Sequence, residues 1–222
     1  MRQPDTAVIF EPATHTYRDE QGAVYPSVTQ IIEPLTRFEM FGDTFYFDRV
    51  SRQVFNGDMI ENARRIGTAI HKGCFYLMTG QGLNWDSLNP LLVEPLKQFN
   101  KWMEEWNPTL IIAEKSMISR KCGYAGTPDI ICTLPAFPGI IIQVDIKTGD
   151  YWWADVQLAA YETLYRENYK YMGKVKNYVL SLPKVGSNYN FVPIDEKDIR
   201  QCWRYFTSKL SEYMFIKRKG GK

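Results

Sequence analysis

The segment from residue 109 to 147 limits the possible folds most, because three short apolar, β-branched runs follow one another there. The runs are TLIIAEKSMIS, GYAGTPDIICTL and GIIIQVDIK, and the turn sequences KCG and PAFPG separate them. Such runs, bounded by Gly and Pro, are typical of mostly buried strands. A helix-forming stretch, WWADVQLAAYETLYREN, and a further strand pattern, KVKNYVLSL, come next. Strand, helix and strand in this order predict a right-handed crossover and a partly parallel sheet. We therefore expect an α/β fold with a β-β-β-α-β core.

The rest of the chain predicts helices and hairpins around this core. An opening hairpin with the turn DEQG precedes a short helix that starts at Ser27, a good N-cap residue. Residues 37–57 are aromatic-rich without a clear period, which indicates irregular or broken helix. Helical spacing predicts helices over 58–78, 88–106 and 195–216, and NFVPI a short edge strand. We expect one domain in four parts: residues 1–57, an N-terminal hairpin with an irregular or helical region; 58–107, a helical region; 108–194, the core; and 195–222, a helix with a basic tail.

Charge and composition exclude several classes of protein. The chain has 27 basic and 25 acidic residues, a net charge of +2, so it is not a histone-like binder that relies on charge alone. The charge is uneven, because residues 151–222 hold 13 basic and 7 acidic side chains and could meet phosphates. No apolar run approaches the roughly 18 residues that span a bilayer, and the start does not resemble a secretory signal. We expect a cytoplasmic protein without membrane contact.

The four cysteines are widely spaced and form no C-x-x-C pair. Structural zinc and iron–sulfur sites need clustered thiolates, so reduced and buried cysteines are expected instead. The chain also lacks the phosphate-binding pattern G-x-x-x-x-G-K-[ST], which argues against a nucleotide cofactor.

Two opposite charges interrupt the third strand run. Asp145 and Lys147 are two residues apart, so their side chains lie on one face of the strand, about 6–7 Å apart along the chain. A structural ion pair is one explanation, although burying such a pair costs desolvation that apolar residues would avoid.

Two further carboxylates favour a metal site over a simple ion pair. Asp129 precedes the apolar part of the second run, and Glu114 interrupts the first, so neighbouring strands each carry one acidic group. Buried carboxylates are costly, and three together repel one another unless a cation lies among them. Oxygen ligands of this kind suit Mg²⁺ or Mn²⁺. A lysine beside them can orient the attacking water and stabilise negative charge on phosphorus.

Two helices supply further candidates. Gln157 and Tyr161 are four residues apart on the helix after the third strand, so they share a face that returns over the carboxylates. A packed aromatic stripe explains them equally well. His71 lies one turn after Gly67 on an earlier helix that also carries two adjacent arginines. A helical histidine is more often a surface or core residue, but this glycine would allow close approach. Nothing of this kind supports a functional role for His15, which lies in the polar hairpin.

Together these motifs resemble the PD-(D/E)XK nuclease superfamily, in particular its RecB-type branch. The motifs are Glu114, Gly126-Thr127-Pro128-Asp129, Asp145-Ile146-Lys147 and Gln157-x-x-x-Tyr161, with Gly67-Thr68-Ala69-Ile70-His71 ahead of them. The resemblance covers residues 60–182, and YPSVTQII at 25–32 extends it. This branch includes phage-encoded exonucleases and the mitochondrial genome maintenance exonuclease. It implies a restriction-endonuclease-like core: a central mixed β-sheet flanked by helices, here with an N-terminal helical region.

The resemblance also implies roles for the site residues. Asp129 and Asp145 would bind the divalent metal together with the backbone carbonyl of Ile146. Glu114 would lie near a metal and contact it directly or through a water molecule. His71 would be an extra ligand or a substrate contact. The groups expected to take part in catalysis are Asp129, Asp145, Glu114, Lys147, Gln157 and Tyr161, with Lys147 acting on the attacking water. The groups expected to contact DNA are Arg64, Arg65, Gln157, Tyr161 and Trp153, with Trp152 beside the last.

The implied function is a Mg²⁺- or Mn²⁺-dependent deoxyribonuclease that digests linear DNA from an end. The resemblance suggests phage DNA recombination, repair or replication in the host cytoplasm, with a single-strand annealing or recombination protein as partner. Because the chain lacks the cluster cysteines of several RecB-type members, no iron–sulfur cluster is expected. Two alternatives stay open: a structure-selective or sequence-specific endonuclease on the same fold, and an inactive DNA-binding accessory protein. The strand polarity and the preference for single or double strands stay open as well.

Overall fold

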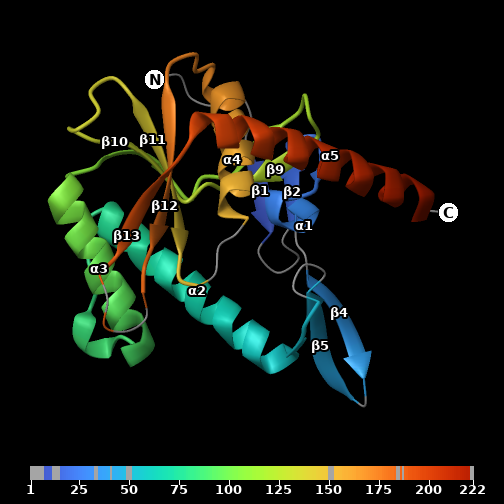
Figure 1. Ribbon diagram of the computed structural model, residues 1–222, viewed down its shortest axis with the longest axis horizontal. Helices are drawn as coiled ribbons and strands as arrows, with labels where there is room; N and C mark the ends of the chain where they lie inside the picture. Colours follow the sequence, from blue (N-terminus) through green and yellow to red (C-terminus); the bar gives the residue numbers. More distant parts are fainter. Residues whose placement is uncertain are drawn as a thin grey trace.

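A five-stranded mixed sheet forms the centre of the protein (Figure 1). The computed structural model describes residues 8–11, 16–32, 35–40, 42–48, 52–149, 153–183, 186 and 188–220. The strand order in the central sheet is β13-β12-β11-β10-β7. Their bounds are β7 Thr109–Ala113, β10 Ile130–Thr133, β11 Ile141–Lys147, β12 Val175–Ser181 and β13 Asn190–Ile194.

The direction of each strand follows from its connection. Strands β7, β10 and β11 pair antiparallel, whereas β11 and β12 pair parallel with Ile141 opposite Val175. Helix α4 (Ala154–Tyr169) makes the crossover between these parallel strands. Strand β13 returns antiparallel at the edge. The expected α/β class and the strand–helix–strand crossover are confirmed.

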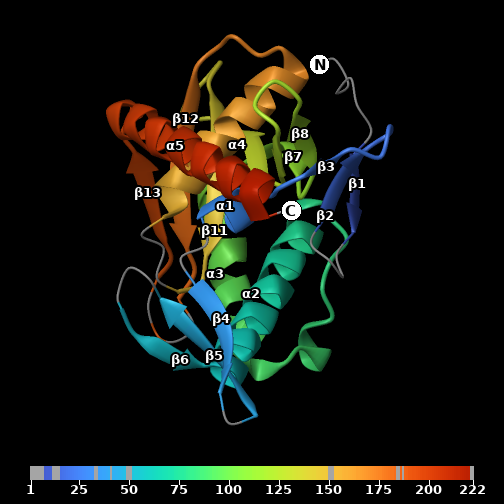
Figure 2. The ribbon, with the colours of Figure 1, turned by 90° about the vertical axis from the view of Figure 1, so that its right-hand side faces the viewer.

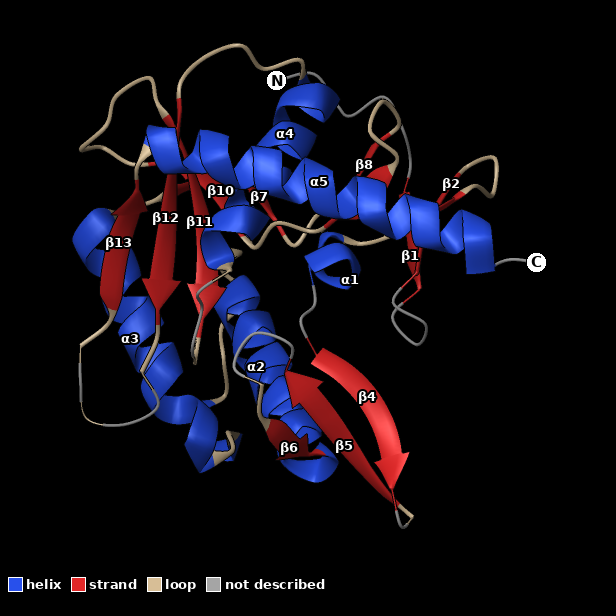
Figure 3. Ribbon diagram, turned by 45° about the vertical axis from the view of Figure 1, so that its right-hand side comes forward, coloured by secondary structure: helices blue, strands red, loops and turns tan. Residues whose placement is uncertain are grey.

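Helices cover both faces of this sheet (Figure 3). On β11, Ile142, Val144 and Ile146 belong to one core cluster, which also includes residues of α2 (Gly57–Met78) and α3 (Pro90–Trp106). The alternate residues of β11 face α4, since the Gln143 side chain donates to the carbonyl of Leu158 at 2.8 Å. Helix α4 packs in turn against α5 (Glu196–Gly220). Because side chains alternate along a strand, this pattern places Asp145 and Lys147 on the α4 face.

The expected helices form with recognisable ends. Asn56 caps α2 by accepting from the backbone N–H of Asp58, and Asn89 caps α3, where Pro90 takes the first position. Helix α3 ends at Asn107, which adopts the left-handed conformation with φ of 44°. The helices expected over 58–78, 88–106 and 195–216 are therefore confirmed, with small shifts at their ends. Among the described residues, none of the helices combines the length and the apolar character needed to cross a membrane.

The first two strand runs each divide into two strands. The strands β8 (Met117–Ser119) and β9 (Tyr124–Gly126) form a separate antiparallel pair outside the central sheet. Glu114 causes the first division, because its φ of 48° is left-handed and cannot continue a strand. The prediction of three strands over 109–147 was thus too simple, although β7, β10 and β11 do lie side by side as expected.

The prediction of irregular or broken helix for 37–57 was wrong. This part contains a three-stranded antiparallel sheet: β4 (Leu35–Met40), β5 (Asp43–Asp48) and β6 (Val54–Asn56). Gly42, with φ of 87°, lies in the tight turn between β4 and β5. Aromatic residues favour strands, but they occupy both faces here and so hide the two-residue period.

The N-terminal hairpin is confirmed and lies beside the upper half of α2 (Figure 2). Strands β1 (Val8–Glu11), β2 (Thr16–Asp19) and β3 (Val24–Tyr25) form it. The short helix α1 (Val28–Ile32) follows. Ser27 accepts from the backbone N–H of Gln30 through Oγ, and the Gln30 side chain accepts from the Ser27 N–H, both at 3.0 Å. This reciprocal capping confirms the predicted N-cap. His15 lies outside the described residues.

Candidate metal and catalytic site

The register of the sheet brings three acidic residues into one row. Ala113 pairs with Ile130, and Ile130 pairs with Val144, across three neighbouring strands. The neighbouring residue is Glu114 directly after β7, Asp129 directly before β10, and Asp145 within β11. The backbone N–H of Glu114 donates to the carbonyl of Asp129 at 3.0 Å, which continues the row beyond β7. The sheet thus juxtaposes carboxylates that are far apart in sequence.

Asp129 is held by both of its oxygens. Its Oδ2 accepts from the backbone N–H of Ile146 at 2.7 Å, and its Oδ1 lies 3.2 Å from Nδ1 of His71. The same imidazole nitrogen is 3.8 Å from Oε1 of Glu114. One ligand atom from each of His71, Glu114 and Asp129 lies within 4.8 Å of the others. These distances suit three side chains that share one cation.

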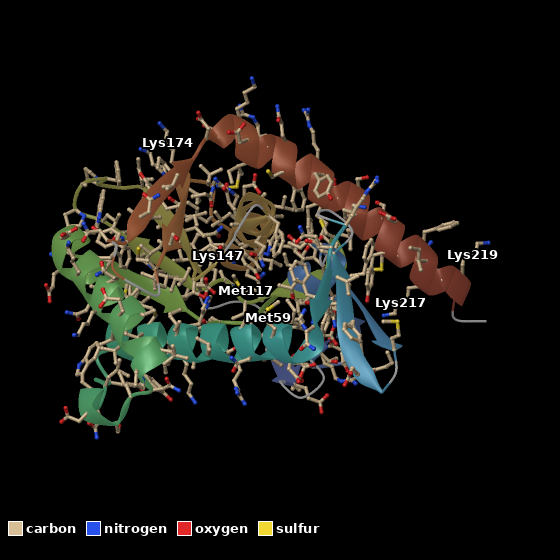
Figure 4. The ribbon with its side chains drawn as sticks, turned by 60° about the horizontal axis from the view of Figure 1, so that its bottom comes forward. Met59, Met117, Lys147, Lys174, Lys217 and Lys219 are labelled. Carbon is tan, nitrogen blue, oxygen red and sulfur yellow. The ribbon has the colours of Figure 1, made fainter. Side chains whose placement is uncertain are left out.

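The second part of the site is a buried lysine–carboxylate pair. Asp145 is 2% exposed, and Nζ of Lys147 lies 2.8 Å from its Oδ2. The same ammonium donates to Oε1 of Gln157 at 2.7 Å, and this amide is buried at the beginning of α4. Lys147 is therefore fixed between a strand and the crossover helix, near the centre of the molecule (Figure 4).

The crowded charges change how the acidic groups hold protons. Burial raises the pKa of Asp145 to about 6, with Lys147 opposing this effect and the neighbouring Asp129 adding to it. Burial would also raise the pKa of Asp129, but the charge and hydrogen bond of His71 hold that pKa below its usual range. Burial raises the pKa of Glu114, although the hydrogen bond with His71 works in the opposite direction. Three carboxyl groups thus lie beside two cationic groups, His71 and Lys147.

His71 carries the counter-charge of this row in the protein alone. Burial by itself would lower the pKa of the imidazole, but the charge and hydrogen bond of Asp129, together with Glu114, raise it to about 10. A proton on this ring thus occupies the position that a cation would take between the two carboxylates. Oxygen ligands with one imidazole nitrogen are a donor set suited to Mg²⁺ or Mn²⁺. The residues present fit a divalent cation.

Most of the residues predicted from sequence for metal binding and catalysis lie together. The site brings together His71, Glu114, Asp129, Asp145, Lys147 and Gln157. Ile146 takes part through its backbone N–H, whereas the predicted ligand role of its carbonyl stays a prediction. Tyr161 is 7% exposed and lies against Gly126, where a Cβ would come 2.6 Å from its ring. Burial raises the pKa of this phenol well above its usual value.

The residues predicted to contact DNA are less concentrated. Arg64 and Arg65 are exposed on α2, where the Arg64 guanidinium lies over the Tyr46 ring at 4.9 Å and Arg65 donates to Asn62. Trp153 directly precedes α4, and its carbonyl accepts from the N–H of Gln157. Trp152 lies outside the described residues.

Three lysines of the last third lie away from the site. Figure 4 shows Lys174 on one side of the molecule and Lys217 and Lys219 at the far end of α5, all separated from Lys147. Their proposed contact with phosphates therefore stays a prediction.

A cavity of about 660 Å³ opens beside the acidic row. His71, Glu114 and Asp129 form part of its wall. The remainder of the lining comes mainly from the N-terminal hairpin, α2 and the β8–β9 region, and it includes aromatic and hydroxyl side chains: Phe10, Tyr17, Ser27, Thr29, Phe75, Ser116, Thr127 and Tyr161. Phe10, Tyr17, Phe75 and Ser116 were missed from sequence, and the short polar hairpin that carries Phe10 and Tyr17 gives no sign of which surface it covers.

Comparisons with known proteins give only distant likenesses. No protein-family model matches the chain, and a search of curated proteins finds no match. Among solved structures, a protein described as a putative exonuclease from Eubacterium rectale has a TM-score of 0.47 and 12% identity, covering 71% of this chain and 68% of that chain. An alkaline exonuclease (LHK-Exo) from Laribacter hongkongensis has a TM-score of 0.30 and 15% identity, covering 56% of this chain and 69% of that chain. Likenesses this distant support no statement about activity.

Proposed function

We propose that this protein is a divalent-metal-dependent nuclease that hydrolyses phosphodiester bonds in DNA. The observation that carries the proposal is the acidic row with its ammonium: three carboxylates from neighbouring strands, with Lys147 2.8 Å from Asp145. A structural ion pair needs one carboxylate and no histidine. The motifs around this row also resemble those of PD-(D/E)XK nucleases, whose chemistry requires this combination of groups.

The residues that would hold the cation are Asp129, Glu114 and His71, with Asp145 and the carbonyl of Ile146 completing the set that the resemblance implies. When bound, a divalent cation supplies positive charge at the scissile phosphate and lowers the pKa of a coordinated water. The carboxylates would orient that cation, and the hydrogen bond from Ile146 fixes the plane of the Asp129 carboxylate. His71 would lose its proton when it becomes a ligand, because only the neutral ring binds a metal.

Lys147 would act on the reacting atoms. Its ammonium is oriented by Asp145 and Gln157, so it needs little reorganisation to donate to an attacking water or to a phosphate oxygen. Such prearranged donors favour the transition state, where negative charge grows on phosphorus. Gln157 would be a positioning residue for this lysine, and Tyr161 would contact the scissile strand from the neighbouring turn of α4.

We propose further that the enzyme attacks linear DNA from an end and serves phage DNA recombination, repair or replication in the host cytoplasm. A single-strand annealing or recombination protein is the proposed partner. All 222 residues would form one nuclease domain, with residues 108–194 as its catalytic core. The family resemblance supports these finer points. The alternatives are a structure-selective endonuclease and an inactive DNA-binding accessory protein.

The test is digestion of linear DNA with and without Mg²⁺ or Mn²⁺, comparing wild type with Asp145→Ala and Lys147→Ala. We expect metal-dependent loss of linear DNA by the wild type and a large loss of rate in both variants. Asp86→Ala is a matched control, because Asp86 is exposed and far from the row in sequence. Circular plasmid cut as fast as linear DNA would favour the endonuclease. Binding of DNA without cleavage by the wild type would favour the accessory protein.

A further inference from the structure

The cavity beside the acidic row suggests which DNA end the enzyme takes. We infer that it holds the base of an unpaired terminal nucleotide, so that the enzyme acts on single-stranded ends. The inference rests on the nuclease function proposed above and names its substrate class. Its basis is the lining of the cavity, which combines the acidic residues and His71 with aromatic side chains, hydroxyl groups and one lysine, Lys72.

Aromatic rings provide surfaces for a base. Phe10 and Tyr17, from β1 and β2, pack together with ring centroids 4.6 Å apart, and Phe75 reaches the cavity from α2. Tyr161 adds a fourth ring from α4. Protein rings that stack on bases are the usual means of holding unpaired nucleotides without reading their sequence. Phe10 and Phe75 are half-buried and are therefore the rings that could stack on a base, whereas Tyr17 and Tyr161, at 3% and 7% exposed, offer little free ring surface.

A chain of hydroxyl groups lies in the same cavity. Oγ1 of Thr127 is 2.9 Å from the Tyr17 hydroxyl and 2.9 Å from Oγ of Ser116. Each of these hydroxyls can donate or accept, so the chain can reverse its direction to match different base edges. Such a lining would orient a base while tolerating all four. We therefore expect little dependence on the terminal base type.

Size and position select a single strand over a duplex. A cavity of about 660 Å³ is in the range that holds one small molecule, which is roughly 300–1,000 Å³. One nucleotide fits this range, whereas a base pair with its stacked neighbours does not. His71, Glu114 and Asp129 line the same cavity, so a base held there would bring its own phosphodiester to the acidic row. A blunt duplex would first have to unpair its end.

The experiment measures binding of a short, internally labelled oligothymidylate by fluorescence anisotropy in EDTA, where metal-dependent cleavage is blocked. Two matched oligonucleotides carry an abasic residue at the 5′ or the 3′ terminus. We expect one abasic end to weaken wild-type binding by about 5- to 100-fold, the effect of losing one stacked base. The end that responds also gives the polarity of digestion. Equal binding of the intact and both abasic oligonucleotides would overturn the inference.

Variants connect the effect to the cavity. Phe75→Leu keeps an apolar side chain without an aromatic face, so it should bind the intact oligonucleotide little better than the abasic one. Tyr76→Leu is the matched control, because Tyr76 is the next residue of α2 and does not belong to the lining. If Phe75→Leu melts early, Phe10→Leu in the hairpin gives the same comparison. If both variants keep the wild-type preference for an intact end, the aromatic wall is not the base site.

The two proposals can fail separately. Base-dependent binding by a wild type that does not cut linear single-stranded DNA with Mn²⁺ would refute the nuclease function and support the base site. Metal-dependent cutting at the same rate from intact and abasic ends would support the nuclease and refute the base site.

Discussion

Replacing Asp145 by Asn distinguishes a metal site from a structural ion pair, because the two explanations predict opposite changes in stability. The carboxyl is 2% exposed, and its pKa is about 6 in the folded protein against an ordinary value of 3.8. Below pH 3.8 this group is protonated in both the folded and the unfolded chain. As the pH rises through 6, the folded chain must ionise a buried group, and stability falls. The difference between the two values corresponds to about 3 kcal/mol.

Asparagine removes this cost because it has no proton to lose. Without metal at pH 8, we expect Asp145→Asn to raise the free energy of unfolding by about 1 to 3 kcal/mol, the lower figure allowing for the lost partner of Lys147. At pH 4.5 the advantage should shrink by about 2 kcal/mol, because the folded carboxyl is then still protonated. Saturating Mn²⁺ should reverse the order, since a ligand at 100 times its Kd stabilises the wild type by about 2.7 kcal/mol.

Urea denaturation in EDTA and in Mn²⁺, at both pH values, measures these changes. Asp86→Asn is the control, because this exposed carboxylate lies outside the row and should leave all four curves unchanged. A variant that is less stable than wild type at pH 8 in EDTA would refute the reasoning. In that case Asp145 would stabilise the metal-free fold through its ion pair with Lys147.

Three further predictions concern other parts of the structure. In metal-free protein, NMR should show the His71 imidazole titrating near pH 10, so its contribution to stability is complete below pH 6.5 and is lost as the pH rises through 10. The variant His71→Gln assigns the NMR signal. Titration near pH 6.5 would contradict the contacts of His71 with Asp129 and Glu114. Gly126→Ala should destabilise the fold by about 1 to 3 kcal/mol in urea, because its Cβ would lie 2.6 Å from the Tyr161 ring, whereas Gly149→Ala meets open space and should be neutral. Burial raises the pKa of the Cys132 thiol to about 12. Alkylation followed by mass spectrometry should therefore find this thiol unmodified in native protein at pH 8 and modified in urea. Rapid labelling of the native protein would argue against the buried position of Cys132.

The sequence predicts the parts of this protein that depend on local periodicity. The two-residue spacing of Asp145 and Lys147 was enough to place them on one face, and their contact at 2.8 Å agrees. The four-residue spacing of Gln157 and Tyr161 also placed both on the face of α4 that returns over the row. These relations depend only on the geometry of one strand or one helix.

Relations between distant segments were harder to predict. The row of Glu114, Asp129 and Asp145 depends on the register between strands, which no single run specifies. The left-handed turn at Glu114 breaks an apolar run that resembles one long strand. The hairpin of Phe10 and Tyr17 contains no sign that it shares a cavity with α2 and the acidic row, because that contact depends on tertiary packing alone.

The hydrogen bond between Lys147 and Gln157 has a consequence for protein synthesis. The amide belongs to the helix that joins the two parallel strands, so a nascent chain that ends before residue 157 lacks one of the two groups that orient the ammonium. That helix packs against β12 as well as β11, so the crossover is complete only when the parallel strands have paired. If the protein is the nuclease proposed above, a growing polypeptide would complete the arrangement around Lys147 only after about residue 181, the end of β12, has emerged.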